Sequence, residues 1–363
     1  MQRATDFQWS VNADGYEIRV HEVGDPPVPQ KYLVPRKVAG THKNVKGGYR
    51  QTVINPLRDD PALFRSFADL SLHSEDIRRF ADEHGWLGVP ESRLERRGTV
   101  GEGIVHWREW MREMRHLLRI WDAIKQENNL ELRKWFDWKT EYQVVYAPSG
   151  VAGNDYKRPI SQRLLQVALD GPIVADRNAS ATHFRYLKRF DLIDPAKLFI
   201  QEELNHWIQH LQLEVRLLWN EELSKLQAAF VPVHLIGALW VQFLTAVTED
   251  LSFRKCNQCR RWFSEAARAA KVFCSDACRM KAYRLRKASG DSEPIVLEQE
   301  DDITDPITTE RVKELNLDGV TVEEIALYYD VLAPDVARLA GIESFGCELY
   351  TDNSETNEIV DTG

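Results

Sequence analysis

Apolar residues recur at helical spacing over much of the first 250 residues of this chain. The segment from Ala62 to His84 carries them every three or four positions, with an interruption near His73. The segment 103–128 places a second set on one broad stripe: Val105, Trp110, Leu117 and Trp121. Residues 195–230 continue in the same manner. Amphipathic helices are therefore predicted for all three regions.

Strand-like patterns are shorter. Residues 1 to about 57 alternate apolar and polar positions, most clearly at 16–20, and turn residues interrupt them at Pro26-Pro27 and Gly47-Gly48. A run at 142–146, followed by a turn at 148–150, predicts a hairpin, and another extended stretch is predicted near 164–169. The predicted fold class is mainly α with minor β (α+β), built on a large helical N-terminal domain.

One uncharged run, Phe230 to Val247, is long enough to raise the question of a membrane span. It contains Pro232, His234 and Gln242 and lacks basic flanks, so a buried core helix is predicted instead. The N-terminus has no apolar leader segment, which favours a reducing cytoplasm and no membrane partner. The hydrophobic fraction of 43% excludes a disordered chain.

Four of the five cysteines fall within 23 residues as C-x2-C-x14-C-x3-C, at Cys256, Cys259, Cys274 and Cys278. Two close pairs of thiolates separated by a loop suit tetrahedral Zn²⁺, and all four positions are filled, which leaves no open coordination site. One structural Zn²⁺ is predicted as the cofactor. Two disulfides are the alternative, disfavoured by the absence of a secretory signal; Cys347 is expected to stay free.

The residues around the cysteines predict how this site is built. Cys256 to Cys259 forms a tight knuckle, and Trp262 and Phe263 are expected to cover the metal. The second pair flanks the first turn of a helix, with Ser275 or Asp276 as the N-cap. A tight turn that carries one cysteine pair, followed by a helix whose first turn carries the other, is typical of a treble-clef-like finger. Because the run 230–247 leads almost directly into it, the finger is expected to pack against the large domain.

Charge is distributed unevenly. Residues 254–287 carry a net charge of +9, whereas residues 288–363 carry −17. The candidate nucleic-acid-binding residues are basic side chains of the knuckle and the helix: Arg260, Arg261, Arg279, Lys281, Arg284, Arg286 and Lys287. They are suited to contact a phosphate backbone. The alternative is a solvated basic face that balances the acidic tail.

The finger resembles a known family. Arg254-Lys255-Cys256, Trp262-Phe263, Phe273-Cys274-Ser275 and Cys278-Arg279-Met280-Lys281 are similar to the CGNR-type (ABATE-like) zinc fingers of bacterial transcription regulators. The resemblance covers mainly residues 254–287, and the Cys-Gly-Asn-Arg tetrapeptide itself is absent. A fainter similarity lies in the helical segment from Asn55 to Gly88. The resemblance implies DNA-binding regulation.

The acidic C-terminal part contains one more ordered pattern. Apolar and turn residues from Arg311 to Leu339 follow helix-turn-helix spacing, and Thr321 with Glu324 forms a capping box. The predicted domains are a mostly helical 1–250 with an extended N-terminal segment, the finger at 251–288, an acidic linker at 289–307, a trihelical unit at 308–345 and a disordered tail at 346–363. The segment in the place of a recognition helix, Pro334 to Leu339, has one basic and one acidic residue, which suits phosphate contact poorly. A protein contact, or shielding of the basic finger, suits this unit better than DNA.

Catalytic patterns are weak. His206, His210 and Glu214 at i, i+4 and i+8 could hold a metal but lack the H-E-x-x-H glutamate, and Gly98 to Gly103 lacks the strand and Lys-Ser/Thr of a phosphate loop. An enzyme is not predicted. Two functions stay open: a cytoplasmic, zinc-dependent DNA-binding transcription regulator whose N-terminal domain takes a small-molecule or protein partner, or a protein-interaction module with purely structural zinc. Oligomeric state and DNA sequence are not predicted.

Overall fold

The computed structural model describes residues 7–23, 27–36, 50–89, 93–96, 99–140, 143–146, 164–166, 191–211, 213–220, 224–265, 271–289, 307–329, 331 and 333–341. About half of what it describes is helical, accompanied by small antiparallel sheets, in agreement with the predicted mainly α class. The chain forms two compact units, Met1–Asp305 and Pro306–Gly363. Within the described residues, no helix is long and apolar enough to cross a membrane.

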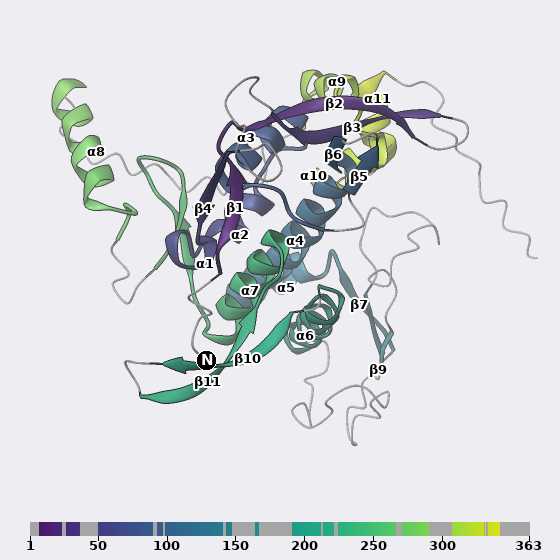
Figure 1. Ribbon diagram of the computed structural model, residues 1–363. Helices are drawn as coiled ribbons and strands as arrows, with labels where there is room; N and C mark the ends of the chain where they lie inside the picture. Colours follow the sequence, from purple (N-terminus) through teal and green to yellow (C-terminus); the bar gives the residue numbers. More distant parts are fainter. Residues whose placement is uncertain are drawn as a thin grey trace, which may run out of the picture. The chain divides into compact units, whose positions relative to one another are not determined.

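The N-terminal strands form two small sheets (Figure 1). Strands β1 (Trp9–Asn12) and β4 (Gln51–Ile54) pair, while β2 (Tyr16–Val23), β3 (Val28–Pro35), β6 (Thr99–Gly103) and β5 (Arg93–Arg96) form a four-stranded sheet in that order. The predicted extended character of this region is thus confirmed where it is described. Strand β5 precedes the segment Gly98 to Gly103 and β6 lies within it, so the expectation that no strand leads into this segment was wrong.

Helices α1 (Pro56–Asp59), α2 (Leu63–Ala68), α3 (Ser74–His84), α4 (Ile104–Lys125), α5 (Asn129–Leu132), α6 (Ile193–His210) and α7 (Leu235–Thr248) form the helical body. The predicted interruption near His73 is confirmed, because α2 and α3 are separate. Tryptophans of the amphipathic segments fill the core: Trp107, Trp110, Trp121 and Trp135 are all buried.

A buried carboxylate ties the sheet to the helices. Glu102 is completely buried and accepts hydrogen bonds from the backbone N–H groups of Leu87 (2.9 Å) and Gly88 (2.6 Å) and from the indole Nε1 of Trp107 (3.1 Å). These donors satisfy a polar group that would otherwise be costly to bury. The segment before α4 is therefore committed to the core rather than open for a phosphate.

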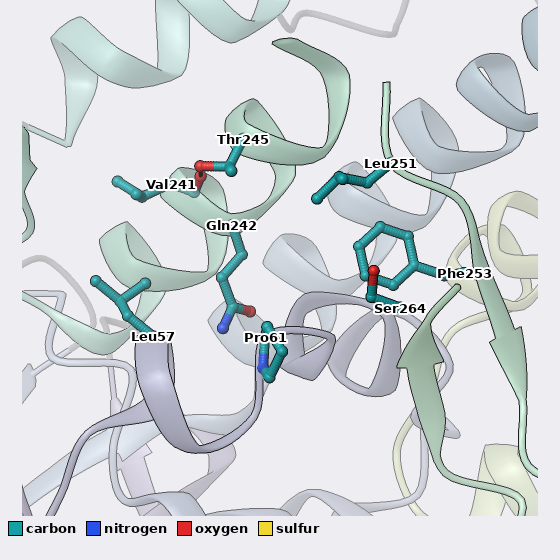
Figure 2. Close-up of a pocket in the computed structure, with 8 residues that line it drawn as sticks. All are labelled: Leu57, Pro61, Val241, Gln242, Thr245, Leu251, Phe253 and Ser264. Carbon is teal, nitrogen blue, oxygen red and sulfur yellow. Dashed lines mark hydrogen bonds between the residues drawn. The ribbon is translucent and has the colours of Figure 1, made fainter. Parts of the chain in front are cut away.

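Helix α7 is the buried core helix that the uncharged run predicted, and ten of its fourteen residues are buried. The run was predicted to begin at Phe230, but Phe230 and Val231 end the strand Lys225–Val231 and the helix begins at Leu235. Its Gln242 is bonded through both ends of the amide: Oε1 accepts from the N–H of Phe64 (3.0 Å), and Nε2 donates to the carbonyls of Pro56 (3.0 Å) and Asp60 (2.7 Å). Figure 2 shows this side chain pointing toward Pro61 in the α1–α2 connection, with Phe253 of the following segment on the other side of the same pocket.

The chain between α5 and α7 differs in part from the prediction. Strands β7 (Phe136–Thr140), β8 (Gln143–Tyr146) and β9 (Leu164–Gln166) pair antiparallel in that order, so the extended stretches predicted at 142–146 and near 164–169 are confirmed where they are described, while the predicted turn at 148–150 lies outside the described residues. Helix α6 ends at His210, and β10 (Glu214–Asn220) and β11 (Lys225–Val231) follow as a hairpin, so the predicted helix over 195–230 was wrong beyond residue 210. Alternation at Val215, Leu217 and Trp219 is the strand signal in this segment.

The cysteine-rich segment contains β12 (Phe253–Lys255), β13 (Trp262–Ser264) and α8 (Asp276–Ser289). Within its described residues, the unit Pro306–Gly363 contains three short helices: α9 (Thr309–Leu317), α10 (Val322–Tyr329) and α11 (Ala333–Ala340). The predicted disordered tail at 346–363 lies outside the described residues. The capping box at the start of α10 is confirmed: the N–H of Thr321 donates to Glu324 Oε2 (2.9 Å), and the N–H of Glu324 donates to Thr321 Oγ1 (3.2 Å).

Candidate metal centre

The first cysteine pair lies in the turn between β12 and β13. The N–H of Cys256 donates to the carbonyl of Arg261 (2.9 Å), and the N–H of Arg260 donates back to the carbonyl of Cys256 (2.9 Å). This closed turn places Cys256, which is fully buried, and Cys259 on the same side of the hairpin. The turn needs a left-handed residue, and Arg260 supplies it with φ of +59°. That conformation favours glycine, so the knuckle carries backbone strain at this position.

The second pair is positioned by a backbone bond and a helix cap. The N–H of Asn257 donates to the carbonyl of Val272 (3.1 Å), which brings the segment before Cys274 against the knuckle. Ser275 then caps α8, because its Oγ accepts from the N–H of Cys278 (3.3 Å) and its carbonyl accepts from the N–H of Arg279 (3.1 Å). Of the two predicted N-cap candidates, the cap is therefore Ser275.

The four cysteine sulfurs meet in one place. The Sγ atoms of Cys256, Cys259, Cys274 and Cys278 all lie within 4.8 Å of one another, and no disulfide joins them. The Sγ of Cys274 is 3.5 Å from the Sγ atoms of both Cys259 and Cys278. A tetrahedral ion with metal–sulfur bonds of about 2.3 Å separates its ligands by about 3.8 Å. The cluster therefore has the size that a single tetrahedral metal ion requires.

The electrostatics of the cluster also call for a cation. Burial raises the pKa of the Cys256 thiol, but the backbone N–H groups of Cys259, Cys274 and Gln258 outweigh it and lower the pKa to about 6. Burial and then the sulfurs of Cys278 and the first pair raise the pKa of Cys274 to about 12. Burial likewise raises the pKa of Cys259. The Cys256 thiol therefore ionises readily, whereas the thiols of Cys259 and Cys274 need a positive ion beside them to become thiolates.

The knuckle is fixed to the helical body through Asp69, the residue that follows α2. The Asp69 carboxylate accepts a hydrogen bond from the indole Nε1 of Trp262 (2.7 Å) and pairs with the Nζ of Lys255 (3.1 Å). The predicted packing of the finger against the large domain is thus confirmed. The indole N–H of Trp262, a residue that was expected to cover the metal, points to the C-terminal end of α2.

Aromatic and cationic contacts extend this docking. The rings of Phe253 in β12 and Phe64 in α2 meet edge to face at 5.2 Å between centroids. The guanidinium of Arg65 lies 5.0 Å from the Trp262 ring and makes two hydrogen bonds of 2.8 and 2.7 Å to Asp122 of α4. Arg65 therefore links the finger's aromatic side chain to the longest helix of the body, and sequence alone gave no signal for any of these partners.

The predicted nucleic-acid-binding residues lie on the knuckle and on α8. Six have exposed side chains: Arg260, Arg261, Arg279, Lys281, Arg284 and Lys287. Arg286 lies within α8, and its side chain is outside the described residues. Two of the six face acidic neighbours, since Arg279 pairs with Asp276 (3.1 Å) and Arg261 lies 3.8 Å from Glu83.

The other metal candidate is not assembled. His206 and His210 stack on α6 with ring centroids 6.0 Å apart, but Glu214 lies in strand β10 and so does not continue their helix face. Within the described residues, the cysteine quartet is the one group of metal-ligating side chains close enough to hold an ion. Cys347 lies outside the described residues.

Comparisons with models of protein families, with curated proteins and with solved structures find no match to this chain. The similarity of residues 254–287 to CGNR-type fingers is therefore neither supported nor contradicted by them.

Proposed function

We propose that the four cysteines hold one structural Zn²⁺ and that α8, fixed at its first turn by that ion, binds the phosphate backbone of DNA. The chain would then act as a zinc-dependent transcription regulator, as its resemblance to the CGNR-type fingers implies. The observation that carries the proposal is that α8 is a basic helix that extends from the metal centre and has no buried side chain among those the structure describes.

Zinc is proposed from the donor set. Four thiolates at tetrahedral spacing select zinc or a single iron ion among the common metals. All four positions are cysteine, so the ion has no open site for a substrate. Its role is to hold two short hairpin strands and one helix turn that bury few residues of their own, and in such small units metal binding supplies much of the folding free energy.

The exposure of α8 supports a partner for it. The helix carries five basic residues and one acidic residue over Asp276–Ser289, and none of its described side chains is buried. A helix of this length is marginal in water without tertiary packing. A helix with positive charge around most of its circumference fits a polyanion, whose phosphates can approach it from more than one direction.

A protein partner is the second candidate, and one observation favours it. Three apolar side chains of α8 are about half exposed: Met280 (45%), Tyr283 (53%) and Leu285 (54%). Such residues are suited to a protein surface. Met280 and Tyr283, three positions apart, share one face of the helix, and Leu285 lies on another, so the three form no continuous apolar stripe, which weakens this alternative relative to DNA.

Metal analysis of the purified chain tests the first part. We expect one equivalent of zinc, retained in Cys347→Ala as the matched control and lost in the double variant Cys274→Ala/Cys278→Ala. Less than about half an equivalent in the unmodified chain, or full zinc in the double variant, would contradict the assignment. If the analysis finds iron in place of zinc, the structural role of the metal stands and only the identity of the ion changes.

A salt titration of DNA binding tests the second part. Affinity should fall steeply between 50 and 200 mM salt, and Arg284→Glu/Lys287→Glu should weaken binding at 50 mM salt at least tenfold and make the dependence on salt shallower. Arg133→Glu/Lys134→Glu, which makes the same charge change on an exposed turn after α5, is the control. Equal losses in both variants would mean that only net charge matters, and absence of salt-dependent binding would favour the protein partner.

A further inference from the structure

The β10–β11 hairpin has one face made only of apolar residues. In the antiparallel register, Val215 lies opposite Phe230, Leu217 opposite Ala228 and Trp219 opposite Leu226. Alternate residues of a strand share a face, so these six positions lie on the same side of the hairpin. The other side carries mixed residues, including the ion pair between Glu214 and Arg216.

This face is open to solvent. Four of its side chains are about two-thirds exposed: Val215 (64%), Leu217 (69%), Trp219 (61%) and Leu226 (59%). Val233, in the short connection to α7, adds a fifth apolar side chain that is 48% exposed. Scattered exposed apolar residues are ordinary, but four on one face of a single hairpin form a continuous patch, which marks an interaction surface.

Among the residues that the structure describes, no third strand pairs with this hairpin. Strands β10 and β11 form a two-stranded sheet by themselves (Figure 1). An isolated two-stranded hairpin is marginally stable in water, and it gains stability when its apolar face packs against another layer. Within the described residues, Leu213 before β10 and Leu235 after β11 are buried, so the hairpin is anchored at its base while its apolar face stays uncovered.

The composition of the face selects the class of partner. None of its six positions carries a charge, so it has no group that attracts a nucleic-acid phosphate. A second copy of the same hairpin presents an equally uncharged surface, and two such faces can stack as two sheets about a two-fold axis. At roughly 100 Å² of apolar surface for each exposed side chain, two copies would bury roughly 800 Å², the range of weak and transient interfaces.

We infer that this chain forms a symmetric homodimer in which the apolar faces of two β10–β11 hairpins pack against each other. The dimer is weak, with a dissociation constant of about 10–100 μM, because the buried area is below that of a standard interface. The inference is independent of the proposed metal and DNA functions, since the hairpin contains none of their residues.

Sedimentation velocity of the full chain between 5 and 300 μM tests it. The unmodified chain should shift from monomer to dimer across this range, whereas Leu217→Glu/Trp219→Glu should stay monomeric at 300 μM. Arg216→Gln, on the opposite face of the same strand, is the control and should dimerise within threefold of the unmodified chain. Leu217→Thr, which removes apolar surface without adding charge, should weaken dimerisation about tenfold.

The folding and the metal content of each variant are measured alongside its dimerisation. Because the substituted side chains are exposed, all variants should keep the far-ultraviolet circular dichroism and metal content of the unmodified chain. A folded Leu217→Thr variant remains informative if the double variant does not fold. The inference is overturned if the unmodified chain is monomeric at 300 μM, or if the face variants dimerise as well as Arg216→Gln. Binding of the monomer to neutral lipid vesicles through Trp219 would also overturn it.

Discussion

Replacing Asp69 by alanine should release the metal-binding hairpin from the helical body. The Asp69 carboxylate is the acceptor for Trp262 Nε1 at 2.7 Å and the partner of Lys255 Nζ at 3.1 Å. Alanine removes both contacts and leaves the indole N–H without its acceptor. The sulfur ligands are untouched, so the change separates docking of the finger from binding of its metal.

The size of the effect follows from the exposure of the groups. A hydrogen bond to a charged acceptor contributes about 1.5–3 kcal/mol. The Lys255 ion pair adds about 0–1 kcal/mol, because both side chains are a quarter exposed and water screens them. Some of the loss is recovered when water reaches the freed N–H. We expect docking to weaken by about 2 kcal/mol, which raises the undocked population about 30-fold.

Hydrogen exchange measured by mass spectrometry reports that population directly. Peptides covering 253–264 should exchange about 30-fold faster in Asp69→Ala, while peptides from α4 stay unchanged. Asp69→Asn keeps an acceptor oxygen and should lie between the two, and Asp250→Asn, at an exposed ion pair with Lys125, should have no effect. Unchanged exchange at 253–264 in Asp69→Ala would show that the aromatic contacts alone hold the hairpin, and the reasoning would fail.

Three further substitutions test the local chemistry. Arg260→Gly should stabilise the metal-bound finger by up to about 1 kcal/mol, seen as slower zinc loss to a chelator, because φ is +59° at this position. Glu102→Gln should lower the free energy of unfolding in urea by about 2–4 kcal/mol, since the amide nitrogen faces N–H donors. Burial, aided by Arg119 and Arg112, lowers the pKa of His116 from 6.5 to about 3, so the unfolded chain alone gains this proton as pH falls below 6.5. Stability should therefore drop with acidification, and His116→Gln should make the loss between pH 7 and 5 smaller by about 1–2 kcal/mol.

The features that sequence predicted are those with a short-range signal. The cysteine spacing brought four sulfurs together because each pair closes a loop of only a few residues. The Thr321–Glu324 capping box formed as expected, since both hydrogen bonds lie within one helical turn. The uncharged run became a buried helix because residues 235–248 offer no charge to place in water.

Two kinds of feature could not be predicted from the sequence: segments whose pattern fits a helix and a strand equally well, and contacts between residues far apart in the chain. Residues 213–231 contain apolar side chains at spacings that satisfy a helix and a strand alike, and the pairing of β10 with β11 decided between them. The partner of Trp262 lies 193 residues earlier in the chain, and a lone aspartate after α2 carries no pattern that identifies it. Contacts of this kind are set by the packed body, and no local propensity encodes them.

A chain of contacts fixes the position of the basic helix α8 relative to the helical body. The cysteine ligands fix the first turn of α8 relative to the knuckle, the knuckle is fixed to α2 by Asp69, and Arg65 connects the same contact to Asp122 of α4. A ligand of the helical body that moved α2 or α4 would therefore change the orientation of α8 without altering the metal site. Loss of the metal would instead release α8 while leaving the body intact, because the core of the body lies outside the finger. The proposed function therefore predicts that the two perturbations are separable: the first should change DNA affinity at constant zinc content, and the second should change both together.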